Sequence, residues 1–135
     1  MKVLIVEDDF SSRLLLQMLL TKYGECHIAV NGREAVLAFR MALDAGRPYD
    51  LICLDIMMPE MDGQAALKEM RALEEARGIV STHGAKIIMT TALGDVKNVS
   101  AAYQELCDGY LVKPIDKAKL IGLLDELKVL TRRIP

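Results

Sequence analysis

The sequence predicts a doubly wound α/β fold, in which five helices cover the two faces of a five-stranded parallel sheet. One observation behind this prediction is that short apolar runs of strand length alternate with helix-like segments along the whole chain. The other is that the apolar runs are continuous, as in strands whose two faces are both buried. Strands that are joined through helices pair in parallel, so the alternation indicates a parallel sheet between two layers of helices.

The first strand and helix are expected within residues 1–24. Residues 3–6 form a short apolar run that is typical of a buried strand. Ser11 and Ser12 follow it, and their hydroxyl groups can cap a helix by accepting from the unpaired N–H groups of its first turn. Gly24 is expected to close this helix.

The next two strand–helix units follow the same pattern. Residues 27–30 are expected to form the second strand, and an Asn31-Gly32 turn leads into a helix over 33–45. The third strand is expected over 50–54, and a loop separates it from a helix over 64–76.

The last two units are predicted from the same signals. Residues 77–85 are polar and are expected to form a surface loop before the fourth strand, 86–90. The fourth helix is expected over 95–106, the fifth strand over 109–112 and the last helix over 116–130. Each of these two helices begins at an aspartate, whose side chain can act as its cap.

Composition and charge exclude several classes of function. Of the 135 residues, 52% are apolar and 27% are charged, so a single globular domain over 1–135 is expected, without a separate output domain. The formal net charge is −2, Trp is absent and no basic stretch occurs. These features argue against a nucleic-acid partner.

The sequence does not predict a membrane or secreted protein. No apolar stretch approaches the roughly 20 residues that span a bilayer, and we expect no signal peptide. Cys26, Cys53 and Cys107 lack CxxC spacing and are expected to be reduced thiols. We therefore expect a cytoplasmic location.

Polar residues follow directly on four of the predicted strands. These residues are Glu7-Asp8-Asp9, Asp55, Thr90-Thr91 and Lys113. Because the carboxyl ends of parallel strands lie along one edge of the sheet, the four groups are expected to meet there. Together they supply carboxylates, a hydroxyl and an ammonium group, which can hold a divalent cation and a phosphoryl group.

These motifs, in this order at strand ends, resemble the CheY-like receiver domains of two-component response regulators. The resemblance extends from residue 3 to about residue 130 and implies the flavodoxin-like strand order 2-1-3-4-5. It also implies that Asp55 is the phosphoacceptor, because a carboxylate can attack phosphorus and form an acyl phosphate. The implied cofactor is Mg²⁺, for which Mn²⁺ could substitute.

The resemblance assigns roles to the acidic residues. Asp8 and Asp55 are expected to bind Mg²⁺ directly, together with the backbone carbonyl of Met57, because Mg²⁺ prefers oxygen ligands. Glu7 is expected to act through a bound water. Asp9 is expected to be a solvated charge that faces away. Without metal, the negative charges of Glu7, Asp8 and Asp55 should repel one another and raise carboxylate pKa values.

The resemblance also identifies a switch. Lys113, before a Pro114 whose peptide bond is implied to be cis, is expected to pair with a phosphoryl oxygen. Thr91 is expected to bind the phosphoryl group, and the adjacent Thr90 is the competing candidate. Tyr110 is the implied aromatic switch: it would turn from solvent into the core and change the surface of the fourth helix, fifth strand and fifth helix.

Two apolar residues bear on the lifetime of the phosphorylated state. In the family, the positions occupied here by Met57 and Leu93 border the path of the attacking water. Neither side chain can orient a water by hydrogen bonding, and both can shield the phosphoryl group. Slow self-dephosphorylation is therefore expected.

The resulting hypothesis is a response regulator that works as a signalling switch and not as an enzyme. Its expected partners are a sensor histidine kinase or histidine phosphotransfer protein and a downstream protein target. It is expected to be a monomer or a phosphorylation-dependent dimer.

One alternative is a receiver-like module that acts without phosphorylation. Another is a small aspartyl-phosphate phosphotransferase or phosphatase, although such chains usually carry an Asp where Met57 stands. A flavodoxin-type cofactor carrier is disfavoured because no hydroxyl- and glycine-rich loop follows the first strand.

Overall fold

The computed structural model of the protein describes residues 1–58, 61–80, 83–92 and 106–129. The strands are β1 (Lys2–Val6), β2 (Glu25–Ala29), β3 (Leu51–Asp55), β4 (Lys86–Ala92) and β5 (Gly109–Lys113). The helices are α1 (Phe10–Leu20), α2 (Gly32–Asp44), α3 (Gly63–Ala76) and α5 (Lys117–Glu126). The predicted helix over 95–106 lies outside the described residues except for its last position.

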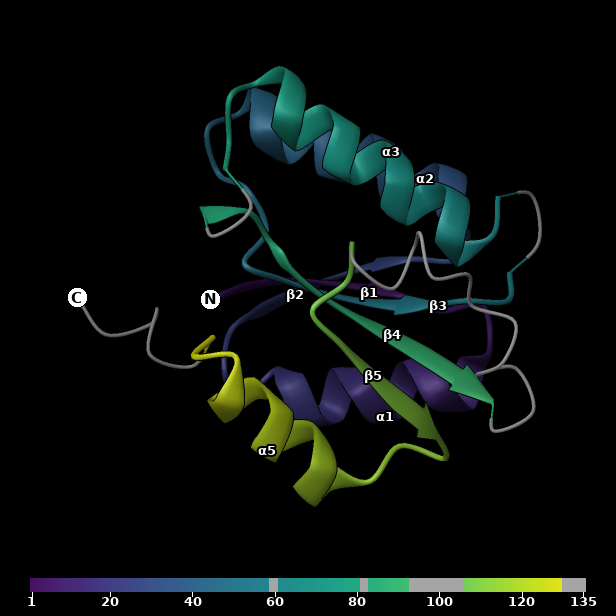
Figure 1. The fold of residues 1–135 in the computed structure, drawn as a ribbon. Coiled ribbons are helices and arrows are strands. Elements are labelled where there is room, and N and C mark those ends of the chain that lie inside the picture. The colour runs from purple at the N-terminus through teal and green to yellow at the C-terminus, as the bar shows by residue number, and fades with distance from the viewer. Residues whose placement is uncertain (59–60, 81–82, 93–105, 130–135) are drawn as a thin grey trace.

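All five strands pair in parallel, in the order β2-β1-β3-β4-β5. The predicted fold class and strand order are therefore confirmed. Helices α2 and α3 cover one face of the sheet, and α1 and α5 cover the other (Figure 1). The carboxyl ends of the strands consequently share one edge, as the doubly wound topology requires.

The core is divided by the sheet into two apolar clusters. Leu4 of β1 belongs to the cluster that contains Phe39 of α2, whereas its neighbour Ile5 belongs to the cluster that contains Leu16 of α1. Both strand residues are fully buried. Successive side chains of a strand point to opposite faces, so a sheet that is covered on both sides requires the continuous apolar runs seen in the sequence.

Helix α1 departs from its predicted boundaries at both ends. It begins at Phe10, because the Asp9 carboxylate accepts from Ser12 N at 2.9 Å and caps the helix in place of Ser11 or Ser12. It ends at Leu20, before Gly24. Gly24 serves a different purpose: a Cβ at this position would collide with the Met1 carbonyl group.

The last helix is shorter than expected, and the fourth strand is longer. Asp116 caps α5 as predicted, but the helix ends at Glu126. Lys128 beyond it has a φ of 60°, which is incompatible with continuing the helix to residue 130. Strand β4 extends to Ala92 instead of ending at residue 90, which places two adjacent threonines within the sheet ladder.

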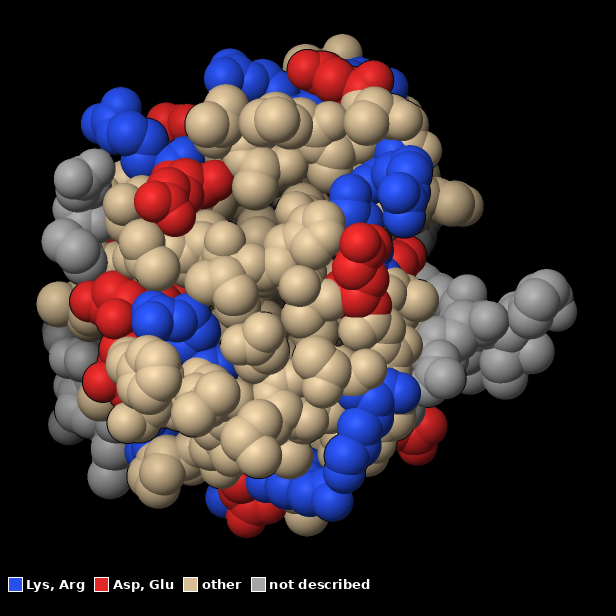
Figure 2. All heavy atoms as spheres, turned by 180° about the vertical axis from the view of Figure 1, so that it is seen from behind, with Lys and Arg blue, Asp and Glu red and all other residues tan. Residues whose placement is uncertain are grey.

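The face opposite to the view of Figure 1 is largely uncharged in its middle, and charged side chains lie mainly toward its rim (Figure 2). Lys and Arg are scattered among Asp and Glu, so the part of this face that the structure describes offers no continuous basic surface to a nucleic-acid backbone. Within the described ranges, none of the helices combines the length and the apolar character needed to cross a membrane.

Candidate functional site

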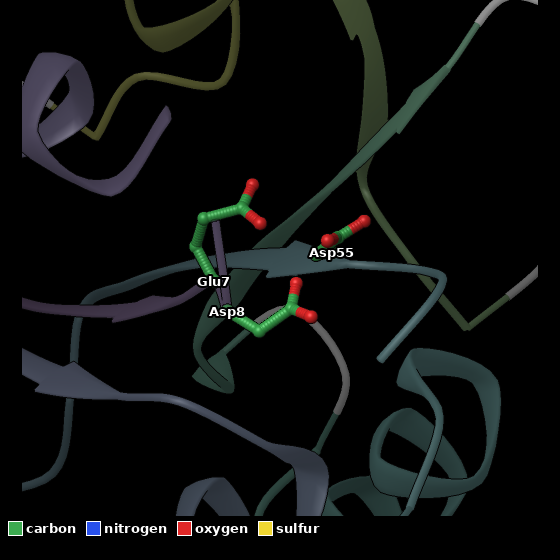
Figure 3. A group of neighbouring side chains, drawn as sticks. All are labelled: Glu7, Asp8 and Asp55. Atoms are coloured by element: carbon green, nitrogen blue, oxygen red, sulfur yellow. The ribbon is translucent and has the colours of Figure 1, made fainter. Parts of the chain in front are cut away.

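Three carboxyl groups gather where β1 and β3 end. Glu7 and Asp8 follow β1 directly and Asp55 is the last residue of β3, so the pairing of these strands brings the three side chains together (Figure 3). One carboxylate oxygen of each residue lies within 4.8 Å of the other two. Hard oxygen donors at this spacing suit a small divalent cation such as Mg²⁺.

Lys113 joins this group from the end of β5. Its Nζ lies 2.6 Å from Glu7 Oε1 and 3.2 Å from Asp55 Oδ2. The peptide bond between Lys113 and Pro114 is cis, as the resemblance implied. One ammonium group therefore bridges two of the three carboxyl groups across the sheet.

The carboxyl groups differ sharply in their exposure. Glu7 is fully buried and Asp55 is 5% exposed, whereas Asp8 is exposed. Glu7 Oε2 also accepts from Asp9 N at 3.1 Å. Glu7 was expected to act through a bound water. In the structure its side chain is buried and paired directly with Lys113, a contact that the sequence did not predict.

Burial and charge shift the pKa values in the site. Burial, with a further contribution from the adjacent Glu7 carboxyl group, raises the pKa of Asp55 to about 7, and Lys113 acts in the opposite direction. A raised carboxylate pKa was predicted from mutual repulsion, but burial is its larger cause. For Lys113, burial lowers the pKa, yet the carboxyl groups of Glu7 and Asp55 outweigh this effect and raise it above its usual value.

The two predicted switch residues lie on the same face of the sheet. Thr91 pairs in register with Val112, and Tyr110 pairs with Met89, so the pleat points all four side chains toward the α2/α3 side. Thr91 is buried, and its hydroxyl donates to the Ala92 carbonyl group at 3.1 Å. Their roles in switching remain predictions.

Tyr110 already points inward in this structure. Its side chain packs against the α2/α3 cluster, and its hydroxyl oxygen is buried beside Cys107. Burial raises the pKa of Tyr110 above its ordinary value, with Cys107 adding to the effect. Of the two orientations that the switch hypothesis requires, this is the one turned toward the core.

The residues expected to tune dephosphorylation are only partly described. Met57 is 58% exposed next to the site, and its backbone N–H donates to Asp55 Oδ1 at 3.3 Å. An apolar side chain at this position is consistent with shielding, which remains a prediction. Leu93 lies outside the described residues.

Sequence reasoning missed the close packing around the Asp55 backbone. Gly63, the first residue of α3, donates from its N–H to the Ile56 carbonyl group at 2.9 Å. A Cβ at position 63 would collide with the Asp55 carbonyl oxygen. The sequence indicated only that this glycine belongs to a loop before a helix, whereas here it allows the start of α3 to pack against the backbone of Asp55 and Ile56.

The comparison with known proteins agrees with this geometry. Residues 3–125 match the family model of the response regulator receiver domain. The chain therefore belongs to the response regulator receiver domain family, as its motifs suggested. Proteins of this family are signalling switches that work through phosphorylation.

Individual receiver proteins are similar to the chain over most of its length. The sensory/regulatory protein RpfC of Xanthomonas campestris pv. campestris is 33% identical over 134 residues, which is 99% of this chain and 17% of RpfC. The receiver domain of the sensor histidine kinase PA1611 from Pseudomonas aeruginosa, which has a magnesium ion coordinated in its active-site cleft, is 28% identical with a TM-score of 0.73. That match covers 93% of this chain and 95% of the other.

Another solved structure of a response regulator resembles the chain to a similar degree. The response regulator TrrA of Thermotoga maritima, in complex with Mg²⁺-BeF, is 31% identical with a TM-score of 0.73, over 93% of this chain and 97% of its own. Among the first curated relatives, the chain spans between 17% and 44% of the length of the protein that it matches.

Proposed function

We propose that this chain is a two-component response regulator that accepts a phosphoryl group on Asp55 in the presence of Mg²⁺. The observation that carries the proposal is the double contact of Lys113 Nζ with Glu7 and Asp55 inside the three-carboxylate cluster. A lone acidic cluster could be a solvated surface. An ammonium group held at the acceptor carboxylate supplies the positive charge that phosphoryl oxygens require.

The proposed reaction is a transfer from a phosphorylated histidine. An Asp55 carboxylate oxygen attacks phosphorus, the bond from phosphorus to the histidine nitrogen breaks, and its electron pair stays on the imidazole. Lys113 pairs with a phosphoryl oxygen and offsets the charge that arrives with it. Met57 N–H, at 3.3 Å from Asp55 Oδ1, helps to fix the orientation of the carboxylate.

Mg²⁺ fits the donor set of this site. Glu7, Asp8 and Asp55 would hold it, with the backbone carbonyl of Met57 as a further ligand, and the bound ion would supply charge against the phosphoryl oxygens. The match with the two magnesium-containing receiver domains supports this assignment. Mn²⁺ prefers similar oxygen ligands and is the expected substitute.

The proposed donor is a sensor histidine kinase or a histidine phosphotransfer protein, and the proposed output is binding or release of a protein target. Phosphorylation of Asp55 would draw Thr91 toward the site and bias Tyr110, which shares its face of the sheet, toward the inward orientation. The surface around β5 and α5 would then differ between the two states and could be read by a partner or by a second copy of the chain.

The proposal is tested by incubating the protein with acetyl phosphate and Mg²⁺ and recording its intact mass. We expect the wild type to gain one phosphoryl group, and Asp55→Ala or excess chelator to prevent the gain. A folded wild-type protein that gains nothing would instead be a receiver-like module that acts without phosphorylation. An equal gain in Asp55→Ala would move the acceptor to another residue.

A further inference from the structure

Thr90 places a buried hydroxyl group directly beside Asp55. The two residues are Cα partners in the β3–β4 ladder, and Thr90 is also the partner of Leu111 on β5. Thr90 is only 1% exposed, and its Oγ1 has no hydrogen-bond partner among the described residues. Burying a hydroxyl group costs free energy unless the group is hydrogen-bonded, so we expect an acceptor near Thr90 Oγ1.

The ladder shows which group can provide that acceptor. Residues in register on neighbouring parallel strands point to the same face, so the Thr90 and Asp55 side chains stand next to each other. Thr91 points to the opposite face. The two adjacent hydroxyl groups therefore cannot serve the same purpose, although the sequence suggested them as competitors for one role.

Lys113 lies on the same face of the sheet as Thr90. It lies two residues beyond Leu111 on β5, on the same face, and its Nζ reaches Asp55 on β3. Strand β4 lies between β5 and β3, and Lys113 is in register with Ala92, so its side chain reaches Asp55 across β4 on the face that carries Thr90. The buried hydroxyl group thus lies on the face of the sheet that carries both the Lys113 side chain and the Asp55 carboxylate.

The Asp55 carboxylate has room for another donor. Among the described residues it meets Lys113 at Oδ2, Met57 N–H at Oδ1 and the neighbouring Glu7 carboxyl group. An ionised carboxylate offers about four acceptor sites. A hydroxyl group on the neighbouring strand can use one of them through rotation about its χ1 angle.

We propose that Thr90 is a positioning residue whose hydroxyl group donates to the Asp55 carboxyl group and so accelerates loss of the phosphoryl group. The inference rests on the proposed phosphorylation of Asp55. The residue that it adds, Thr90, lies on the opposite face from Thr91. Thr90 acts on the carboxyl group of the acyl phosphate and not on its phosphoryl oxygens.

The chemistry gives the direction of the effect. In hydrolysis, the oxygen of a water attacks phosphorus, and the bond between phosphorus and the Asp55 oxygen breaks. The electron pair of that bond returns to the carboxylate, and the proton of the water leaves with the released phosphate or to solvent. Negative charge therefore grows on the carboxyl group in the transition state. A hydroxyl donor binds this charge more strongly than it binds the acyl phosphate, so it lowers the barrier.

Two substitutions at Thr90 separate the hydroxyl group from the methyl group. Thr90→Val keeps the shape and removes the donor, and Thr90→Ser keeps the donor and removes the methyl group. The proteins are phosphorylated with acetyl phosphate and Mg²⁺, the small donor is removed, and the decay of the phosphorylated mass is followed. We expect decay in Thr90→Val to be about three- to tenfold slower than in wild type, the effect of one hydrogen bond, and decay in Thr90→Ser to match wild type.

Thermal unfolding provides the second measurement. Thr90→Ser should have the lower midpoint of the two variants, because it loses the buried methyl group that Thr90→Val keeps. Equal decay in all three proteins would overturn the inference, as would slow decay in both variants, which would assign the effect to packing. If wild-type protein gains no phosphoryl group, the proposed function fails and this inference with it. Normal phosphorylation with unchanged decay rejects the role of Thr90 alone.

Discussion

Replacing Asp55 by Asn is expected to stabilise the metal-free protein at pH 8 and to leave its stability almost unchanged at pH 4. The ionised Asp55 carboxylate is buried next to Glu7, and Lys113 offsets only part of the cost of its charge. Asparagine has nearly the same shape but carries no charge. The substitution therefore removes an electrostatic cost that exists only when Asp55 is ionised.

The sign and size follow from the raised pKa. The pKa of Asp55 rises from 3.8 to about 7 on folding, so the folded state keeps a proton that the unfolded chain loses between these values. Stability is then present below about pH 4 and declines as the pH rises to about 7. A difference of about three pKa units corresponds to about 4 kcal/mol. The edge of the site is open to solvent, and allowing for screening leaves about 2 kcal/mol.

Urea unfolding in chelator at pH 4 and pH 8 measures this difference. Asp55→Asn should gain about 2 kcal/mol over wild type at pH 8 and close to nothing at pH 4. Asp125→Asn on the exposed side of α5 is the matched control and should show no pH-dependent gain. If Asp55→Asn were no more stable than wild type at pH 8, or equally more stable at both pH values, burial of an ionised Asp55 would not be the source of the cost.

Three further predictions test other parts of the structure. Arg71→Ala should lower the free energy of unfolding by about 3 kcal/mol, because it removes the cation that pairs with the buried Glu74 and the partly buried Asp108, and a loss below 1 kcal/mol in urea melts would contradict this. Gly63→Ala should cost about 2 kcal/mol through collision with the Asp55 carbonyl group, whereas Gly122→Ala, in open space on α5, should gain up to about 1 kcal/mol. The two glycine variants must therefore shift the urea midpoint in opposite directions. Changing Met57 and Leu93 together to polar residues should shorten the lifetime of the phosphorylated protein, measured by intact mass, and an unchanged lifetime would count against shielding.

The Arg71 prediction comes from a network that joins distant parts of the chain. Arg71 donates to Glu74 Oε1 at 2.7 Å, to Asp108 Oδ2 at 2.9 Å, and to the carbonyl groups of Ala85 and Leu106 at 2.9 and 2.8 Å. Glu74 is 4% exposed, and it also accepts from Ala85 N at 2.8 Å. The network ties α3 to the segments that lead into β4 and β5, so one side chain holds together the end of the domain opposite the site.

The contrast between what the sequence predicted and what it did not has a physical explanation. A sheet covered on both faces requires continuous apolar strands, and the parallel topology brings the strand ends to one edge, so the fold and the group formed by Glu7, Asp8, Asp55 and Lys113 could be predicted. The fold class and the shared edge depend on pattern and order, whereas the strand order 2-1-3-4-5 was implied by the family resemblance. They do not require knowledge of which side chains touch.

Most of the features that were missed depend on pairing between distant residues. The Arg71 contacts join residues up to 37 positions apart, and no local pattern reveals them. The face on which Thr90 lies follows from the register between β3 and β4, and a shift of one residue would exchange it with Thr91. Asp9 was missed as a helix cap because a capping carboxylate and a solvated one look the same in sequence when they adjoin an acidic pair.

The site combines an electrostatic conflict with a rigid scaffold, and this combination explains how it can act as a switch. Three carboxyl groups lie together and Lys113 pairs with two of them, so the metal-free site carries excess negative charge where these two carboxyl groups are buried. Binding a divalent cation relieves that conflict, whereas a phosphoryl group adds charge that must be met by Lys113 and the cation together. In the proposed switch Thr91 would turn toward the new charge, while Glu7 and Asp55 are held at the ends of their strands. Because Thr91 and Tyr110 share one face of the sheet, we expect a small movement at the site to reach the surface through packed side chains.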